Sequence, residues 1–322
     1  MTVAYHRAAV ALRHASSVVV CGHVRPDGDA VGSVLAATLA LRAAGIPAVP
    51  TLADATPAPS TYAFLPGFAL FAFAADLEPP DAFLALDAPD PERLGVAKDL
   101  ALGARQLVVL DHHPGASEFG TVNVLDQQAA ATGQMVWHLL ETLEVEPTPE
   151  IALCCFVALQ TDTGRFQFSN TSPQALRDAA DMIEAGVDPA EASRLVYESR
   201  SLEALELEAR TLSRLTLAND GRVAYAWIDD ADFEATGARP EDTEHLVNAI
   251  RVLGGVEVAM LFRVHADEVR ANLRAKSRFD VSAVARRFGG GGHVAASGFT
   301  WAGTLDDLLG EILPLLPGGA PA

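Results

Sequence analysis

The amino-acid sequence predicts an α/β protein in which a doubly wound, mainly parallel sheet is joined by a helical linker to a smaller α+β domain. Two observations support this prediction. In the first half of the chain, short apolar runs of strand length alternate with segments of helical spacing, as expected of parallel strands joined by crossover helices. The chain also has 322 residues, about twice the length of one ordinary domain.

The first domain is expected over residues 1–190. Its predicted strands are short apolar runs that each end on a polar residue or glycine, at residues 17–22, 81–87, 106–111 and 121–125. Its predicted helices show helical spacing of apolar residues, at residues 29–44, 132–143, 150–160 and 173–185. The first and last of these helices run into a glycine, which is a common stop signal.

A smaller domain is expected over residues 218–316. The segment 191–217 is rich in Glu, Arg, Ala and Leu, a composition that predicts one solvated connecting helix. The predicted strands of the second domain are 223–228, 256–265, 268–273 and 295–299, and its predicted helix is 281–288. Residues 317–322, Pro-Gly-Gly-Ala-Pro-Ala, are expected to be a disordered tail.

Composition and charge exclude several classes of protein. Half of the residues are hydrophobic and 20% are charged, which argues against a disordered or fibrous chain. The longest apolar run, at 151–159, is far shorter than the roughly 20 residues of a membrane helix. The net charge of −19 disfavours binding to anionic membranes and to long duplex nucleic acid. We therefore expect a cytoplasmic protein that holds any phosphate locally.

Two polar clusters follow predicted strands. His23, Asp27 and Asp29 come directly after the first strand. Asp111 is the last residue of the third strand, and His112 and His113 follow it. Ligands of open parallel sheets bind beyond the carboxyl ends of the strands, so both clusters stand where a site is expected. Taken alone, the first cluster could be a polar turn with Asp29 as helix cap, and the second could be a chance histidine pair. Adjacent histidines in an extended segment point to opposite sides, which leaves one for a metal and one for substrate.

Two further acids complete a candidate metal centre. Asp87 closes the second strand and Asp162 follows an apolar segment, although either alone is more often a turn former. Four aspartates and two histidines without thiolate could hold two divalent ions, which favours Mn²⁺, with Mg²⁺ or Co²⁺ as alternatives. Two such ions about 3.5–4 Å apart would activate water for in-line attack on phosphorus.

A glycine run marks the second domain. Residues 289–292 are four glycines and His293 follows them. Their backbone amides could bind an anion, although a bare glycine run could equally be a flexible loop. Between residues 263 and 287 the chain has seven basic and three acidic residues. This local positive charge favours phosphate binding.

Together, the clusters resemble the metal motifs of the DHH phosphoesterase superfamily, and the glycine run with His293 resembles the signature of the DHH-associated C-terminal domain. The two-domain layout is similar to the stand-alone NrnA type, which comprises oligoribonucleases that are also pAp phosphatases. The resemblance covers roughly residues 15–305.

The resemblance implies a role for each matching residue. One metal would be held by His23, Asp27 and Asp87, and the other by Asp29, Asp87, His112 and Asp162. His113 would face the scissile phosphate and Asp111 would orient a neighbouring histidine. The substrate would be bound by Arg274, Gly290, Gly291, Gly292 and His293. The chain departs from the family pattern at Asn272 and Ala275, positions that are often Ser.

The function expected from these features is Mn²⁺-dependent hydrolysis of short RNA, of about two to five nucleotides and including pApA, to nucleoside monophosphates by a two-metal mechanism. Dephosphorylation of pAp to AMP is expected at the same site. The alternatives are a cyclic-di-AMP phosphodiesterase, a RecJ-like single-strand exonuclease, and a nucleotide-sensing regulator without hydrolysis. The sequence leaves open whether the protein is a homodimer.

Overall fold

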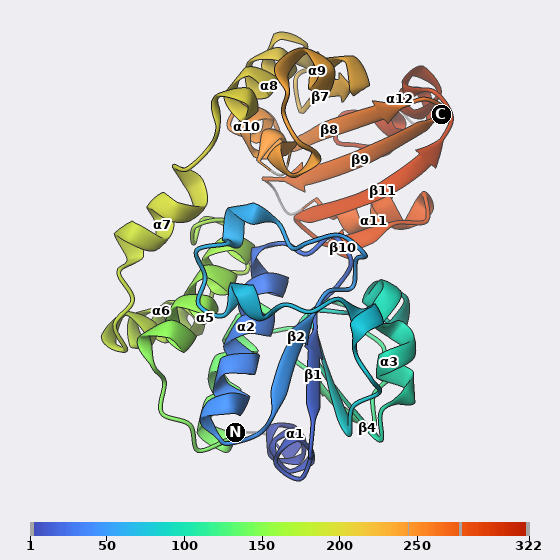
Figure 1. The fold of residues 1–322 in the computed structure, drawn as a ribbon. Coiled ribbons are helices and arrows are strands. Elements are labelled where there is room, and N and C mark those ends of the chain that lie inside the picture. Colours follow the sequence, from blue (N-terminus) through green and yellow to red (C-terminus); the bar gives the residue numbers. More distant parts are fainter. Residues whose placement is uncertain (1–2, 244, 277–278, 320–322) are drawn as a thin grey trace. The chain divides into compact units, whose positions relative to one another are not determined.

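The computed structural model describes residues 3–243, 245–276 and 279–319. The chain divides into two compact units, Met1–Ser199 and Arg200–Ala322, which Figure 1 shows from blue to red along the sequence. No helix in these described ranges is long and apolar enough to cross a membrane.

The first unit contains a parallel sheet of five strands in the order β2-β1-β3-β4-β5. The strands are β1 (Val18–Cys21), β2 (Ala48–Thr51), β3 (Ala82–Leu86), β4 (Gln106–Asp111) and β5 (Val122–Leu125). The four strands predicted from sequence are present. The edge strand β2 was not predicted, because it is four residues long and contains Pro50. In this strand order, the ligand crevice of an open α/β sheet lies between β1 and β3.

Alternate strand residues face the two sides of this sheet. Val20, Leu84 and Leu110 pack on one side with α1 (Val3–Arg13), α2 (Gly28–Ala43), α4 (Thr132–Thr142), α5 (Pro149–Asp162) and α6 (Pro173–Glu184). Cys21 and Phe83 pack on the other side with α3 (Lys98–Gly103) and the short helical turn before it. Helices on both sides confirm the doubly wound arrangement.

The segment between the units differs from its prediction. One continuous helix over 191–217 is wrong, because α7 (Pro189–Tyr197) ends before α8 (Leu202–Ser213) begins. The side chain of Ser201 caps α8 by accepting a hydrogen bond from the backbone N–H of Ala204 at 3.1 Å. The amino-acid composition is similar on both sides of this break, so the sequence pattern did not indicate two separate helices.

The second unit contains a mixed sheet of six strands in the order β10-β11-β9-β8-β7-β6. The strands are β6 (Thr216–Ala218), β7 (Val223–Asp229), β8 (Val258–His265), β9 (Glu268–Ala275), β10 (Gly291–His293) and β11 (Ala296–Ala302). Only β7 and β8 pair in parallel. This mixed sheet with helices confirms the predicted α+β class.

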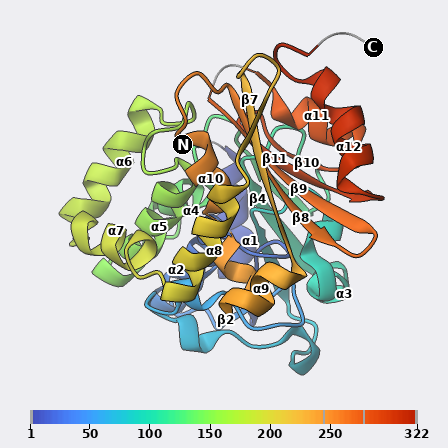
Figure 2. The ribbon, with the colours of Figure 1, turned by 90° about the horizontal axis from the view of Figure 1, so that it is seen from above.

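The helices of the second unit lie on both sides of its sheet (Figure 2). On one side α8 and α10 (Leu246–Arg251) pack against the sheet, close to α9 (Asp230–Thr236). On the other side lie α11 (Val281–Arg287) and α12 (Leu305–Ile312). At the end of the chain, the N–H of Gly319 donates to the carbonyl oxygen of Leu316 at 2.9 Å. Of the predicted tail, residues 317–319 thus form a turn and 320–322 lie outside the described residues.

Candidate metal centre

The loop after β1 supplies the first candidate ligands. Asp27 is the N-cap of α2, and its Oδ1 accepts hydrogen bonds from the backbone N–H groups of Asp29 and Ala30, both at 3.1 Å. This cap fixes the turn that carries His23 and Asp27 and places Asp29 in the first helical turn. The polar-turn interpretation is therefore correct for the turn but wrong for the cap, because Asp27 and not Asp29 is the capping residue.

Asp87 stands at the centre of the site, directly after β3. Its φ is +56°, a left-handed conformation that aspartate tolerates better than most residues but that stores strain. Its Oδ2 lies 3.3 Å from Nε2 of His23, and its Oδ1 lies 3.4 Å from Nε2 of His112. The two oxygens of one carboxylate thus face two different histidines.

His112 follows β4 and connects the remaining acids. Its Nε2 lies 3.6 Å from Oδ2 of Asp29 and 3.7 Å from Oδ2 of Asp162, at the end of α5. Among the described residues of the first unit, three groups of ligand atoms that lie within 4.8 Å of one another share Asp87. One of them is Asp87 with Asp111 and His113, and the other two contain the predicted metal ligands. These two groups are His23 with Asp27 and Asp87, and Asp29 with Asp87 and His112.

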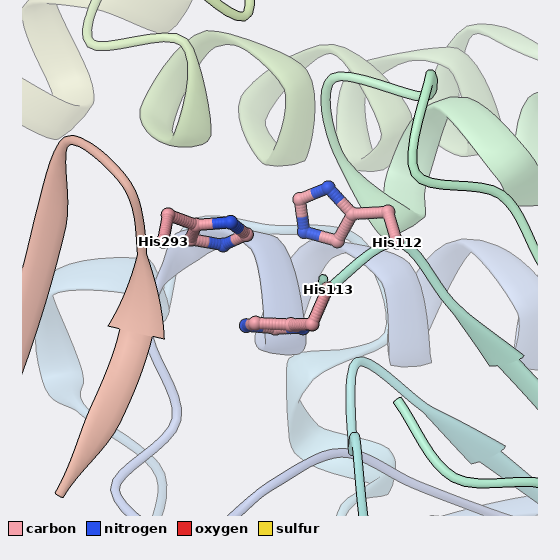
Figure 3. A group of neighbouring side chains, drawn as sticks. All are labelled: His112, His113 and His293. Atoms are coloured by element: carbon pink, nitrogen blue, oxygen red, sulfur yellow. The ribbon is translucent and has the colours of Figure 1, made fainter. Parts of the chain in front are cut away.

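His113 points to a different set of partners from His112. The two rings lie edge to face, with centroids 5.0 Å apart (Figure 3). The backbone N–H of His113 donates to Oδ1 of Asp111 at 2.7 Å, and its Nδ1 lies 3.2 Å from Oδ2 of Asp111. Nδ1 of His113 also lies 3.5 Å from Oδ1 of Asp87. The structure thus brings together all eight residues predicted for this centre.

Burial makes the centre electrostatically unusual. It raises the pKa of Asp29, and the charge of Asp87 raises it further. Burial and the charges of Asp27 and Asp87 likewise raise the pKa of Asp162, to about 6, despite the opposing effect of His112. Burial alone would lower the pKa of His23, but hydrogen bonds to Asp27 and Asp87 raise it to about 10. Buried carboxylates that lie close together and require a cation to carry their negative charge are typical of metal sites.

The hydrogen bonds of the histidine rings also fit a metal site. Nδ1 of His23 donates to the carbonyl oxygen of Val24 at 2.8 Å, and Nδ1 of His112 donates to the carbonyl oxygen of Ala129 at 3.2 Å. Each ring therefore turns Nε2 toward the carboxylates, as metal-binding histidines do. Carboxylate oxygens and imidazole nitrogens without thiolate form a donor set that suits Mn²⁺ or Mg²⁺.

Residues at the start of α4 also contact the candidate ligands, and the sequence analysis missed them. The backbone N–H groups of Thr132 and Gly133 donate to Asp29 at 2.7 and 2.8 Å. The hydroxyl of Thr132 donates to Oδ1 of Asp87 at 3.0 Å. The available signal was the position of Thr132 and Gly133 at a predicted helix start, where backbone N–H groups lack partners within the helix.

Four of the five predicted substrate-binding residues lie on the sheet of the second unit, and Gly290 comes directly before its edge strand β10. His293 lies on β10 (Figure 3) and pairs with Ala296 of β11. Ala296 also pairs with Arg274 of β9. Residues in register on neighbouring strands project from the same face, so His293 and Arg274 share a face. Ala275 is buried in the core of this unit, so this departure from the family pattern lies on the opposite face.

Gly291 and Gly292 also belong to β10, so they form an edge strand rather than a flexible loop.

Two basic residues of the predicted positive segment 263–287, besides Arg274, have structural partners in the same unit. The guanidinium of Arg263 lies 4.7 Å from the ring centroid of Phe233, and Nη2 of Arg286 lies 3.6 Å from Oδ2 of Asp280. Arg278 lies outside the described residues.

Both halves of the chain match known family models. Residues 17–159 match the DHH family, N-terminal domain, and residues 220–315 match the DHHA1 domain. The bifunctional oligoribonuclease and PAP phosphatase NrnA of Thermus thermophilus is 35% identical over 289 residues, which are 89% of this chain and 84% of that protein. The protein of the same name from Bacillus subtilis is 28% identical over 293 residues, 88% of this chain and 90% of its own.

Solved structures show the same fold at lower identity. An exopolyphosphatase-related protein from Bacteroides fragilis superposes with a TM-score of 0.87 at 22% identity and covers 95% of this chain and 93% of its own. RecJ from Thermus thermophilus, in complex with Mn²⁺, gives a TM-score of 0.53 at 17% identity over 95% of this chain and 53% of that one. With both domains matched and a relative at 35% identity, the chain belongs to the DHH phosphoesterase family, as an enzyme with an N-terminal DHH domain and a DHHA1 domain.

Proposed function

We propose that this phosphoesterase hydrolyses short oligoribonucleotides, of about two to five nucleotides, to nucleoside monophosphates and removes the 3′-phosphate of pAp. In these reactions, water and pApA give two AMP, and water and pAp give AMP and phosphate. The observation that carries the proposal is the buried group of acids and histidines around Asp87, in a chain that is 35% identical to a protein named oligoribonuclease and PAP phosphatase.

We assign the ligands of two Mn²⁺ ions to two of the three groups that share Asp87. One ion would be held by His23, Asp27 and Asp87, and the other by Asp29, Asp87, His112 and Asp162. Bound Mn²⁺ would supply polarisation of a phosphoryl oxygen and a water of lowered pKa. His113, held by Asp111, would contact the scissile phosphate. Mg²⁺ and Co²⁺ are the alternative metals.

In the DHHA1 domain, the proposed phosphate site is the face that carries Arg274 and His293, next to the glycine run that includes Gly291 and Gly292. The N–H of Gly290 donates to the carbonyl oxygen of Ala285 at 2.9 Å, so this glycine would contribute through its position and not through its amide. Recognition of a terminal phosphate favours short RNA, mononucleotides and dinucleotides as substrates. The net charge of −19 opposes binding of long nucleic acid. Cytoplasmic location and homodimer formation stay predictions.

The first test is turnover of pApA by the purified protein with Mn²⁺, with the products separated by chromatography. We expect AMP from the wild type and none from Asp87→Ala. Asp99→Ala, which alters an exposed acid on α3, is the matched control and should retain turnover. Absence of AMP, with pAp and pyrophosphate also unchanged, would support the nucleotide-sensing regulator instead.

The length of RNA separates the proposal from the exonuclease alternative. Activity should fall steeply as RNA lengthens from about 3 to about 24 nucleotides, because long anionic chains are repelled by the acidic protein. Constant activity over that range would favour a RecJ-like single-strand exonuclease. Faster hydrolysis of cyclic-di-AMP than of pApA would favour the cyclic dinucleotide as substrate.

A further inference from the structure

One short segment, residues 129–134 at the start of α4, contacts three of the candidate ligands directly. The carbonyl oxygen of Ala129 accepts the Nδ1–H of His112 at 3.2 Å. The backbone N–H groups of Thr132 and Gly133 donate to the two carboxylate oxygens of Asp29, at 2.7 and 2.8 Å. The Thr132 hydroxyl donates to Oδ1 of Asp87 at 3.0 Å.

A fourth ligand is reached through Asn170. Nδ2 of this residue donates to the carbonyl oxygen of Ala130 at 3.0 Å and lies 3.4 Å from Oδ2 of Asp162. On its other side the segment is anchored in the protein interior. Oε1 of Gln134 accepts the N–H of Ala130 at 2.7 Å, and Nε2 of Gln134 donates to the buried Asp178 at 2.5 Å.

The four ligands reached in this way form the set assigned to the second ion. They are Asp29, Asp87, His112 and Asp162. The shared ligand Asp87 is contacted selectively, because Thr132 binds Oδ1, which faces His112, and not Oδ2, which faces His23. Among the described residues, no hydrogen bond joins residues 129–134 to His23 or Asp27. Nδ1 of His23 donates to Val24, and Oδ1 of Asp27 accepts from the start of α2.

We infer that residues 129–134 position the ligands of the second ion independently of the first, with Thr132 as the main positioning residue. This inference rests on the proposed two-metal centre. The Thr132 hydroxyl occupies one lone pair of Oδ1 and so fixes the direction in which the other points. Losing such a partner of a ligand typically weakens metal binding about 10- to 100-fold, so the effect should fall on one ion and spare the other.

The test is calorimetric titration of the metal-free protein with Mn²⁺, which resolves two dissociation constants. His23→Ala identifies the constant of the first ion and Asp162→Ala that of the second. Thr132→Val should raise the second constant about 10- to 100-fold and leave the first within about twofold. Thr132→Ser keeps the hydroxyl and should restore the wild-type value.

Thr38→Val is the matched control, since Thr38 is also buried and its hydroxyl donates to the carbonyl oxygen of Val34 within α2. It should bind both ions as the wild type does. Asn170→Ala provides a second variant should Thr132→Val not fold, and should weaken the same constant as Asp162→Ala. Melting temperatures of the metal-free variants show which of them are folded.

The outcomes distinguish failure of the positioning inference from failure of the proposed two-metal centre. Unchanged constants in folded Thr132→Val and Asn170→Ala, or equal weakening of both ions, overturn the positioning role. Binding of fewer than two Mn²⁺ by the wild type overturns the metal centre of the proposed function, and the inference with it. A second constant that rises in Thr132→Val and recovers in Thr132→Ser supports the inference.

Discussion

Oδ1 of Asp111 accepts the backbone N–H of His113 at 2.7 Å, and Oδ2 of the same carboxylate lies 3.2 Å from Nδ1 of the His113 ring. Asp111 is fully buried, so this carboxylate holds both the backbone and the ring of His113. Asp111 thus fixes Nδ1 as the nitrogen of His113 that faces the first unit's buried carboxylates. This arrangement explains how adjacent histidines can serve different partners.

Asp111→Asn should lower kcat about 100-fold with little change in Mn²⁺ affinity. The amide still accepts the backbone N–H, but its NH₂ group faces Nδ1 and favours the wrong tautomer of His113. Steady-state kinetics with pApA, together with calorimetry of Mn²⁺ binding, measure the two effects. A loss of Mn²⁺ affinity as large as the loss of kcat would instead make Asp111 part of the metal site.

Metal removal should destabilise the first unit. Mn²⁺ at 100 times its dissociation constant stabilises the folded state by about 2.7 kcal/mol, and it also relieves repulsion among the buried carboxylates. Chelation should therefore lower the melting temperature of the wild type and of the exposed control Asp99→Ala, but not of Asp87→Ala. Equal responses of all three proteins to the chelator would contradict a centre built on Asp87.

The positions of three candidate ligands were predictable because each comes at the end of a strand-length apolar run. His23 follows β1, Asp87 follows β3 and His112 follows β4, and strands of a parallel sheet bring their carboxyl ends to one edge. Polar residues at such positions have few structural explanations. The fold of the first unit and its candidate ligands could therefore be obtained together, from one pattern.

Other parts of the site carry no comparable pattern. Thr132 and Gly133 act on Asp29 through backbone N–H groups, which every residue but proline possesses, and threonine at a helix start is common. β10 has three residues, too few to show a strand period, and two of them are glycine. The break between α7 and α8 depends on the capping hydrogen bond of Ser201, which charge composition does not reveal.

The buried Asp178 predicts acid sensitivity away from the metal centre. Burial would raise its pKa, but hydrogen bonds from His138, Gln134 and Gln174 lower it overall. A carboxyl with a lowered pKa stabilises the fold above its ordinary pKa of about 3.9, and this contribution is lost as the pH falls below that value.

Asp178→Asn should thus destabilise the protein by about 1–3 kcal/mol at pH 7, because an amide cannot accept all three hydrogen bonds. The difference from the wild type should shrink as the pH falls below about 3.9, because the unfolded chain is then protonated at this carboxyl while the folded protein still holds it ionised. Urea unfolding at pH 7, 4 and 3 measures this, with the exposed Asp181→Asn on the same helix as control. A difference that does not vary with pH would assign the effect of Asp178 to packing.

Gly290, directly before β10, and Gly291, its first residue, allow steric and binding effects to be separated. A Cβ at Gly290 would lie 2.2 Å from the carbonyl oxygen of Gly298 and 2.4 Å from Cβ of Phe299, whereas a Cβ at Gly291 would meet no atom within 4 Å. Gly290 is therefore required for the close approach of the chain to β11. Gly291 has no such packing requirement, so its substitution tests the proposed binding role without a steric clash inside the domain.

Gly290→Ala should lower the stability of the DHHA1 domain by about 1–3 kcal/mol, as overpacking does. Gly291→Ala should keep the wild-type melting temperature and raise KM for pApA about tenfold, because its methyl group would occupy the space proposed for the substrate phosphate. Gly254→Ala, at another exposed glycine where a Cβ meets nothing within 4 Å, should change neither quantity. Differential scanning fluorimetry and steady-state kinetics test all three variants. An unchanged KM in Gly291→Ala would remove this glycine from the phosphate site and leave Arg274 and His293 as its candidates.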